Sequence, residues 1–259
     1  MIMKIKVLVF NILLVSMFSF AYADGVGTKI FQYRDDGTYI RETELPDYIN
    51  IRFNMQVLIG SDNLPVVASS YSLFKLDMEG DPAWRVDFEE YQTHPMAMDA
   101  EGNVYFTDSG KQLTKIDPLG EVEWTLDFSP ANIRDVMIIG EEIYLLLVEA
   151  ASANCGYSLQ ALNDEGDRLW DAQLTETESE QRIRFLSGKA EKLFILLKND
   201  ISLVWKYAID GVLEWQYQEN NKFSVGCHDE DENLYLANWK TFFALRSEER
   251  RVGKECRSR

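Results

Sequence analysis

The stretch QLTKIDPLGEVEWTLDF, residues Gln112–Phe128, decides the fold. Two runs of alternating apolar and polar residues flank Asp117-Pro118-Leu119-Gly120, and this pattern predicts a β-hairpin because Asp, Pro and Gly all favour tight turns. Glycine closes such a turn because it adopts a positive φ without steric cost. Trp124 follows the glycine by four residues.

The same hairpin recurs along the chain at a nearly fixed spacing. The turn glycines are Gly37, Gly80, Gly120, Gly166 and Gly211. Trp84, Trp124, Trp170 and Trp215 stand four residues after the last four glycines. In the first repeat, Arg41 takes that place. The spacing of 40 to 46 residues, with four short strands in each unit, predicts an all-β fold, a β-propeller of four-stranded antiparallel blades.

Two further apolar segments precede each hairpin. We expect first strands within residues 49–54, 95–98, 135–139, 183–186 and 223–227, and second strands within 103–106, 142–145, 192–195 and 233–236. A single blade cannot bury both of its faces, so neighbouring blades must cover each other. The four tryptophans are therefore predicted to dock adjacent blades, and the five glycines to form the turns. A β-sandwich fits the in-register Gly-to-Trp spacing poorly.

The repeat units LFKLDMEGDPAW, LTKIDPLGEVEW, LQALNDEGDRLW and LVWKYAIDGVLEW resemble the pyrroloquinoline-quinone-like repeat of quinoprotein-type β-propellers. The resemblance extends over residues 29–245, and it implies that the repeated tryptophan docks adjacent blades. The repeat that contains Gly211 departs from the pattern at Ala208, where an Asp is expected. Enzymes of this family oxidise alcohols or sugars with a bound quinone and Ca²⁺. The chain lacks an adjacent Cys pair and an assignable cluster of carboxylate, Asn and Arg, so we expect no PQQ, no Ca²⁺ and no other cofactor.

The two ends of the chain differ from the body. Residues 1–23 are predicted to be a signal peptide, because basic Lys4 and Lys6 precede an apolar run that ends in Ala21-Tyr22-Ala23. The alternative is a membrane anchor, although the apolar run is short for a span. Residues 24–245 hold the repeats. Residues 246–259 are basic, lack aromatic residues and resemble a translated sequencing adapter, so they are excluded from the fold; a basic tail that binds an anionic partner is the alternative.

The tail interrupts the last unit before its turn, Gly and Trp. We therefore expect an incomplete propeller of about five to six blades from a gene truncated at its 3′ end. Such a product is expected to form an open arc with an exposed strand edge.

The net charge of residues 24–245 limits the kinds of partner that they can bind. Without Lys4, Lys6 and the six basic and three acidic residues of the tail, the 26 basic and 43 acidic residues fall to 18 and 40, a net charge of −22. Such a surface repels nucleic acid and anionic lipid. Cys155 and Cys227 remain in the body, and their pairing in an oxidising compartment is left open.

No pattern of catalytic residues emerges. His94 and His228 stand apart in the sequence, and no nucleotide-binding or nucleophile-elbow motif occurs. The segment Asp229–Asn233 has oxygens for Ca²⁺ but is interpreted as an exposed turn, because it lacks the spacing of a calcium loop. Trp205 and Trp239 are expected in blade cores, with sugar stacking as the alternative.

The leading functional hypothesis is an exported, periplasmic or secreted, non-catalytic β-propeller scaffold that binds a protein or another ligand. No catalytic, cofactor-binding or metal-binding residue is assigned, and no stable membrane span is expected after signal removal. The alternatives are a periplasmic quinoprotein-like dehydrogenase or other propeller enzyme with its site beyond residue 245, and a carbohydrate-binding module. The fold alone licenses no activity.

Overall fold

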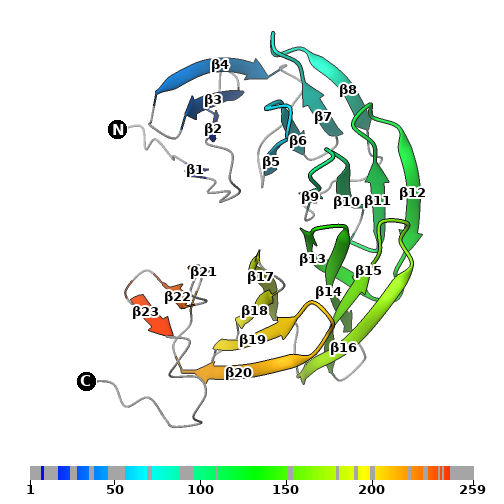
Figure 1. Cartoon of the computed structure of the whole chain (residues 1–259), viewed down its shortest axis with the longest axis vertical. Helices are drawn as coiled ribbons and strands as arrows, with labels where there is room; N and C mark the ends of the chain where they lie inside the picture. Colours follow the sequence, from blue (N-terminus) through cyan, green and yellow to red (C-terminus); the bar gives the residue numbers. More distant parts are fainter. Residues whose placement is uncertain are drawn as a thin grey trace. The chain divides into compact units, whose positions relative to one another are not determined.

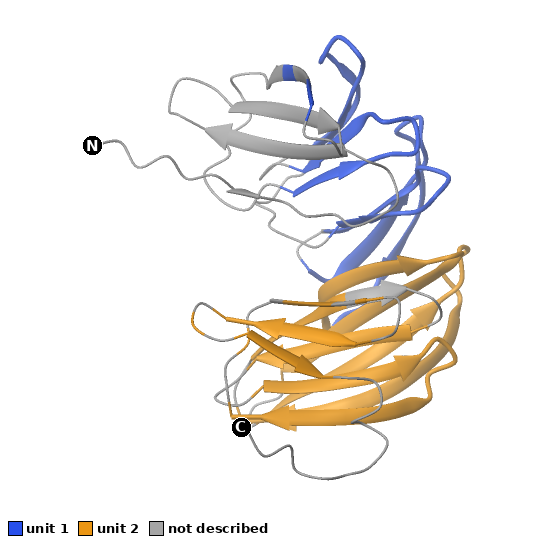
Figure 2. Ribbon diagram, turned by 60° about the vertical axis from the view of Figure 1, so that its left-hand side comes forward, with its two compact units in different colours: residues 1–129 blue, residues 130–259 orange. Residues whose placement is uncertain are grey.

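The structure is a computed structural model of the whole chain. It describes residues 7–8, 17–23, 28–34, 38–45, 56–68, 72–87, 96–108, 110–150, 154–178, 181–189, 192–198, 202–220, 223, 225–229, 233–238, 240 and 242–245. Two compact units divide the chain, Met1–Ser129 and Pro130–Arg259, coloured separately in Figure 2. In the described parts of the chain there is no helix, and hence none that is long and apolar enough to cross a membrane.

The first unit contains three four-stranded antiparallel sheets. In each sheet, strands that follow one another in the chain pair side by side, as Figure 1 shows. The strands of the first sheet are β1 Val7–Leu8, β2 Met17–Ala23, β3 Thr28–Arg34 and β4 Tyr39–Leu45. Those of the second are β5 Gln56–Ile59, β6 Pro65–Ala68, β7 Ser72–Leu76 and β8 Pro82–Asp87. Those of the third are β9 Met96–Met98, β10 Val104–Asp108, β11 Gln112–Ile116 and β12 Val122–Asp127.

The second unit contains two four-stranded sheets and one three-stranded sheet, again with sequential antiparallel pairing. Its first sheet is β13 Asn132–Ile139, β14 Glu142–Ala150, β15 Cys155–Leu162 and β16 Arg168–Thr177. The next is β17 Arg182–Lys189, β18 Lys192–Lys198, β19 Ser202–Ala208 and β20 Leu213–Glu219. The last is β21 Val225–His228, β22 Leu234–Ala237 and β23 Phe242–Leu245.

The predicted repeat is confirmed as a series of all-β, four-stranded antiparallel sheets, one for each turn glycine. Six sheets among the described residues agree with the expected five to six blades. The first strand of the second sheet lies further along the chain than predicted, at β5, and residues 49–54 are outside the described residues. Residues expected to be cleaved as a signal form β1 and β2, so removal after Ala23 would leave β3 and β4 in that sheet.

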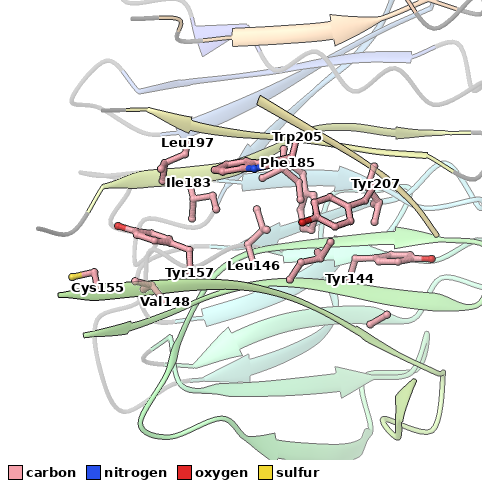
Figure 3. Close-up of a cluster of buried hydrophobic side chains, with 14 residues drawn as sticks. Tyr144, Leu146, Val148, Cys155, Tyr157, Ile183, Phe185, Leu197, Trp205 and Tyr207 are labelled. Atoms are coloured by element: carbon pink, nitrogen blue, oxygen red, sulfur yellow. The ribbon is translucent and has the colours of Figure 1, made fainter. Parts of the chain in front are cut away.

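Apolar side chains are buried between successive sheets within each unit. In the second unit, Tyr144, Leu146 and Tyr157 of one sheet face Ile183, Phe185 and Trp205 of the next (Figure 3). In the first unit, Val66 and Leu73 pack with Val104 and Ile116 of the following sheet. Burial of these faces removes apolar area from water and is the main favourable term holding neighbouring sheets together. Trp205 is 3% exposed, in the core as predicted, and Trp239 lies outside the described residues.

Candidate functional site

The hairpin turns adopt the conformation that their residues favour. Gly80, Gly120, Gly166 and Gly211 have φ values of 96°, 92°, 88° and 85°, a region that side chains other than glycine rarely occupy. Gly37 lies outside the described residues.

In two of these turns, an aspartate at the first position accepts hydrogen bonds from the backbone of the turn. Asp77 Oδ1 accepts hydrogen bonds from the backbone N–H groups of Glu79, Gly80 and Asp81 at 2.9, 2.8 and 2.8 Å. At Asp117 the equivalent oxygen accepts from Leu119 and Glu121 at 2.9 and 2.8 Å. Where Ala208 replaces this aspartate, Gly211 N–H still donates to the Ala208 carbonyl at 3.1 Å. The turn that contains Ala208 therefore keeps its backbone hydrogen bond and its glycine without the carboxylate.

Two tryptophans lie against the turn of the following sheet. Trp84 Nε1 of β8 donates to the carbonyl of Pro118, in the β11–β12 turn, at 3.0 Å. A Cβ added to Gly120 in that turn would lie 2.7 Å from the Trp84 ring. Trp170 Nε1 of β16 likewise donates to the Ile209 carbonyl at 2.7 Å.

The second of these contacts also needs a glycine. A Cβ on Gly211 would lie 2.8 Å from the ring of Trp170. The tryptophan of one repeat and the turn glycine of the next are therefore two halves of one contact, which the sequence spacing had not revealed. We propose that this contact docks adjacent blades.

Trp124 and Trp215 occupy the same strand position. Trp215 packs in a cluster that joins Phe194 and Val204 of one sheet to Leu236 and Leu245 of the next. The Trp124 ring lies 6.0 Å from that of Tyr105, with the planes tilted by 55°. Tyr144 with Trp170, and Phe194 with Trp215, repeat this tilted arrangement at 6.0 and 6.1 Å. For all four tryptophans, docking stays a proposal.

Three lysines in the middle of strands are buried, and sequence reasoning missed them. Lys75, Lys115 and Lys206 expose only 9%, 4% and 5% of their surface. Each is the direct cross-strand partner of a repeat tryptophan: Lys75 of Trp84, Lys115 of Trp124 and Lys206 of Trp215. A lysine in an alternating strand resembles a solvent-facing residue, so only the register of the fourth strand reveals its burial.

Each buried lysine has a carboxylate partner. The Nζ–carboxylate distances are 2.6 Å for Lys75–Asp62, 2.9 Å for Lys115–Glu123 and 2.7 Å for Lys206–Glu214. Lys192 also pairs with Glu214. Burial acts to raise the pKa of Glu214, but hydrogen bonds from Lys192 and Lys206 outweigh it and the pKa is lowered. In the fourth repeat, Ala161 lies opposite Trp170, and there is no such pair. An apolar residue can therefore take the place of the buried lysine at this position.

Asp135 connects two sheets of the second unit. Its carboxylate on β13 accepts the N–H of Phe185 on β17 at 2.8 Å and that of Val136 at 3.0 Å. Burial raises the pKa of this carboxyl to about 6, while the two N–H groups and nearby Arg184 act in the opposite direction. The pairing of β13 with β14 shifts register between Ile133 and Asp135, next to this carboxylate.

Hydrogen bonds join the two ends of the acidic segment considered for Ca²⁺, and residues 230–232 between them lie outside the described residues. Asp229 Oδ2 accepts Nδ2 of Asn233 at 2.9 Å and the hydroxyl of Tyr235 at 2.8 Å, and Oδ1 accepts the Asn233 N–H at 2.8 Å. Asp99 binds Asn103 and Tyr105 in the same way, at 2.7 and 3.1 Å through Oδ2. The repetition of this arrangement at two equivalent places supports the interpretation as a turn.

The cysteines and the other candidate metal ligands form no site among the described residues. Cys155 is buried and Cys227 is exposed, and neither forms a disulfide. Within the described ranges, no group of three or more His, Cys, Asp and Glu side chains could hold a metal ion. His94 and the side chain of His228 are outside what the structure describes.

Sheets of sequential antiparallel strands, repeated with a turn glycine and a tryptophan, define a β-propeller built from PQQ-like repeats. The family model described as "Outer membrane protein assembly factor BamB" matches residues 72–229, well over half of the chain. The chain belongs to this family.

Solved propellers share the fold at low sequence identity. BamB from Moraxella catarrhalis is 14% identical, with a TM-score of 0.51 over 88% of this chain and 78% of that one. BBS1N, solved in complex with ARL6DN, is 14% identical, with a TM-score of 0.59 over 84% and 71%. The Nup133 β-propeller domain of Vanderwaltozyma polyspora is 10% identical, with a TM-score of 0.54 over 89% and 79%. No curated protein sequence matches the chain.

Proposed function

We propose that this protein is an exported β-propeller scaffold that binds a protein partner and works without a bound cofactor. Membership of the family described as an outer membrane protein assembly factor carries the proposal. Two further observations support it. The similar propeller BBS1N was solved with a protein bound, and the carboxylates of Asp77, Asp117, Asp99 and Asp229 all accept hydrogen bonds within their own turns.

Export is the finer part of the proposal. It rests on the signal-like pattern of residues 1–23 and is supported by the family description, which names an assembly factor for outer membrane proteins.

Crosslinking in the cell envelope tests partner binding. The protein, tagged and expressed in its own host, is crosslinked, purified and analysed by mass spectrometry. We expect the same protein to be recovered in every replicate and to be missing from a tag-only control. Replicates that return nothing above the control would contradict the scaffold proposal.

The absence of a cofactor is tested separately. Pyrroloquinoline quinone and Ca²⁺ are added to the purified protein with alcohols and aldoses as substrates. We expect no change in the quinone spectrum and no dye reduction, and turnover of any of these substrates would replace the scaffold by a dehydrogenase.

A further inference from the structure

Exposed apolar side chains gather at one place in the repeat. Among the described residues, the exposed large apolar side chains are Tyr39, Met78, Leu119, Val122, Leu169, Val212, Leu213 and Phe242. All except Phe242 stand within three residues of a turn glycine, in the hairpin between the third and fourth strands. Isolated exposed apolar residues are ordinary on a protein surface. Here, however, they recur near the same hairpin in successive repeats.

The tryptophan contacts bring these turns together within each unit. In the second unit, Leu169 precedes Trp170, which binds the Ile209 carbonyl in the turn that also holds Val212 and Leu213. In the first unit, Met78 lies in the turn that leads into Trp84, and Trp84 binds Pro118 beside Leu119. Each unit therefore carries a pair of neighbouring turns with exposed apolar side chains.

Exposed acidic residues stand close in the sequence to these apolar residues in both units. Glu79, Asp81 and Glu121 are exposed in the turns of the first unit, and Glu165, Asp167 and Asp210 in those of the second. Of the two arginines beside these turns, Arg85 bonds Asp87 at 2.6 Å and Arg168 lies 3.4 Å from Asp171. We call the first set, with Met78, Leu119 and Val122, turn surface 1, and the second, with Leu169, Val212 and Leu213, turn surface 2. Both surfaces are apolar and acidic.

We propose that the turn surfaces bind a partner segment that is both basic and apolar. This inference rests on the proposed function and names the chemistry of its partner. Opposite charge steers such a segment to the acidic turns, and burial of the apolar side chains holds it there. A second copy of the chain fits poorly, because its turns bring the same negative charge, and so does an anionic membrane.

Model peptides test this chemistry on the full chain. The probes are short fluorescent peptides of alternating Lys and Leu, alternating Lys and Ser, and alternating Glu and Leu, followed by anisotropy. We expect the Lys–Leu peptide to bind best and to weaken as salt increases. Equal binding of the Lys–Ser peptide would overturn the apolar part of the proposal, and equal binding of the Glu–Leu peptide would overturn the acidic part.

Substitutions locate the binding. Two triple variants, Met78→Ser/Leu119→Ser/Val122→Ser and Leu169→Ser/Val212→Ser/Leu213→Ser, alter exposed positions, so the fold is expected to persist, as circular dichroism would show. Each is expected to weaken binding to its own surface, and the combined variant to weaken the Lys–Leu peptide by about tenfold or more. Phe242→Ser is the matched control, an exposed apolar residue away from the turns.

The outcomes separate this inference from the proposed function. Unchanged peptide binding in the combined variant, or an equal loss in Phe242→Ser, overturns the turn surfaces. Recovery of the envelope partner by the combined variant as efficiently as by the wild type also overturns them, yet leaves the scaffold function in place.

Discussion

At the scale of single residues, the contact of Trp170 with Gly211 explains why the repeat needs both. The indole covers a backbone turn, and only a residue without a side chain lets it approach. The positive φ of Gly211 and its closeness to the ring are two separate reasons for glycine, and they can be measured apart.

The substitution Gly211→Ala is predicted to destabilise the second unit more than Gly140→Ala does. Both glycines have positive φ, 85° and 61°, so each alanine carries a backbone cost of about 1 to 2 kcal/mol. At Gly140 no atom lies within 4 Å of the added Cβ, whereas at Gly211 the Trp170 ring lies at 2.8 Å. Crowding adds about 1 to 3 kcal/mol. Urea unfolding of both variants measures the difference, and equal losses would show that the tryptophan contact is unimportant.

Asp135 is predicted to make stability depend on pH. Its folded pKa of about 6 lies above the ordinary 3.8, so the folded state takes up this proton first. The carboxyl therefore opposes folding above pH 6, and this cost, about 3 kcal/mol, fades as pH falls through 6 toward 4.

The variant Asp135→Asn removes that charge. The stability of the variant minus that of the wild type should therefore be more favourable to the variant at pH 7.5 than at pH 4.5. Thermal melting of both proteins at several pH values measures this difference. Glu165→Gln removes one exposed charge and serves as the control. A difference between Asp135→Asn and wild type that does not vary with pH would contradict the assignment.

At the scale of the strands, each blade carries a row across its second, third and fourth strands. In the third sheet this row is Tyr105, Lys115 and Trp124, and in the fourth it is Tyr144, Ala161 and Trp170. These two sheets keep aromatic residues at the ends of the row and exchange the middle member, whereas in the second sheet Val66 stands where the first aromatic residue would be. Where that member is a buried lysine, a carboxylate must come with it.

Copying the fourth repeat into the third tests this coupling. Glu123→Leu alone is predicted to cost about 1 to 3 kcal/mol, because it leaves the 4% exposed Lys115 without its carboxylate. The double variant Lys115→Ala/Glu123→Leu reproduces the Ala161 and Leu169 of the fourth repeat and should recover most of that loss. A double-mutant cycle in urea measures the coupling energy, and additive effects would refute it.

The sequence allowed the hairpins to be predicted, but not the contacts across strands and sheets. Gly120 and Trp124 fix the third and fourth strands because their turn chemistry is local. First strands lack such markers, which is why β5 begins beyond the predicted residues 49–54. The pairing of Trp84 with Pro118, and of Asp135 with Phe185, joins residues that lie 34 and 50 positions apart. A single sequence contains no local signal for either.

At the scale of the whole molecule, the same turn serves two purposes. Its inner side receives the tryptophan of the preceding sheet, and its outer side presents apolar residues such as Leu119 and Val212 among carboxylates. Each further repeat therefore adds another turn with exposed apolar and acidic residues. Partner binding by several weak, equivalent turns would follow from this construction, since linked sites raise the overall affinity without new contacts.

Export of the protein would change its first sheet, because signal cleavage falls within that sheet. Expressed in a host with a periplasm, the protein is predicted to appear there with Asp24 as its first residue, because Ala21 and Ala23 form a small-residue cleavage site. Intact mass of the periplasmic fraction measures this, and Ala21→Arg/Ala23→Arg should keep the full-length form.

Cleavage at this site would remove β1 and β2, leaving β3 and β4 as a two-stranded hairpin. An isolated hairpin is marginal in water, so it must draw its stability from elsewhere in the exported protein. Hydrogen exchange should then show β3 and β4 opening more easily than β14 and β15, whose sheet keeps all four strands. Equal protection of the two pairs after cleavage, or full-length protein retained in the cytoplasm, would contradict this account.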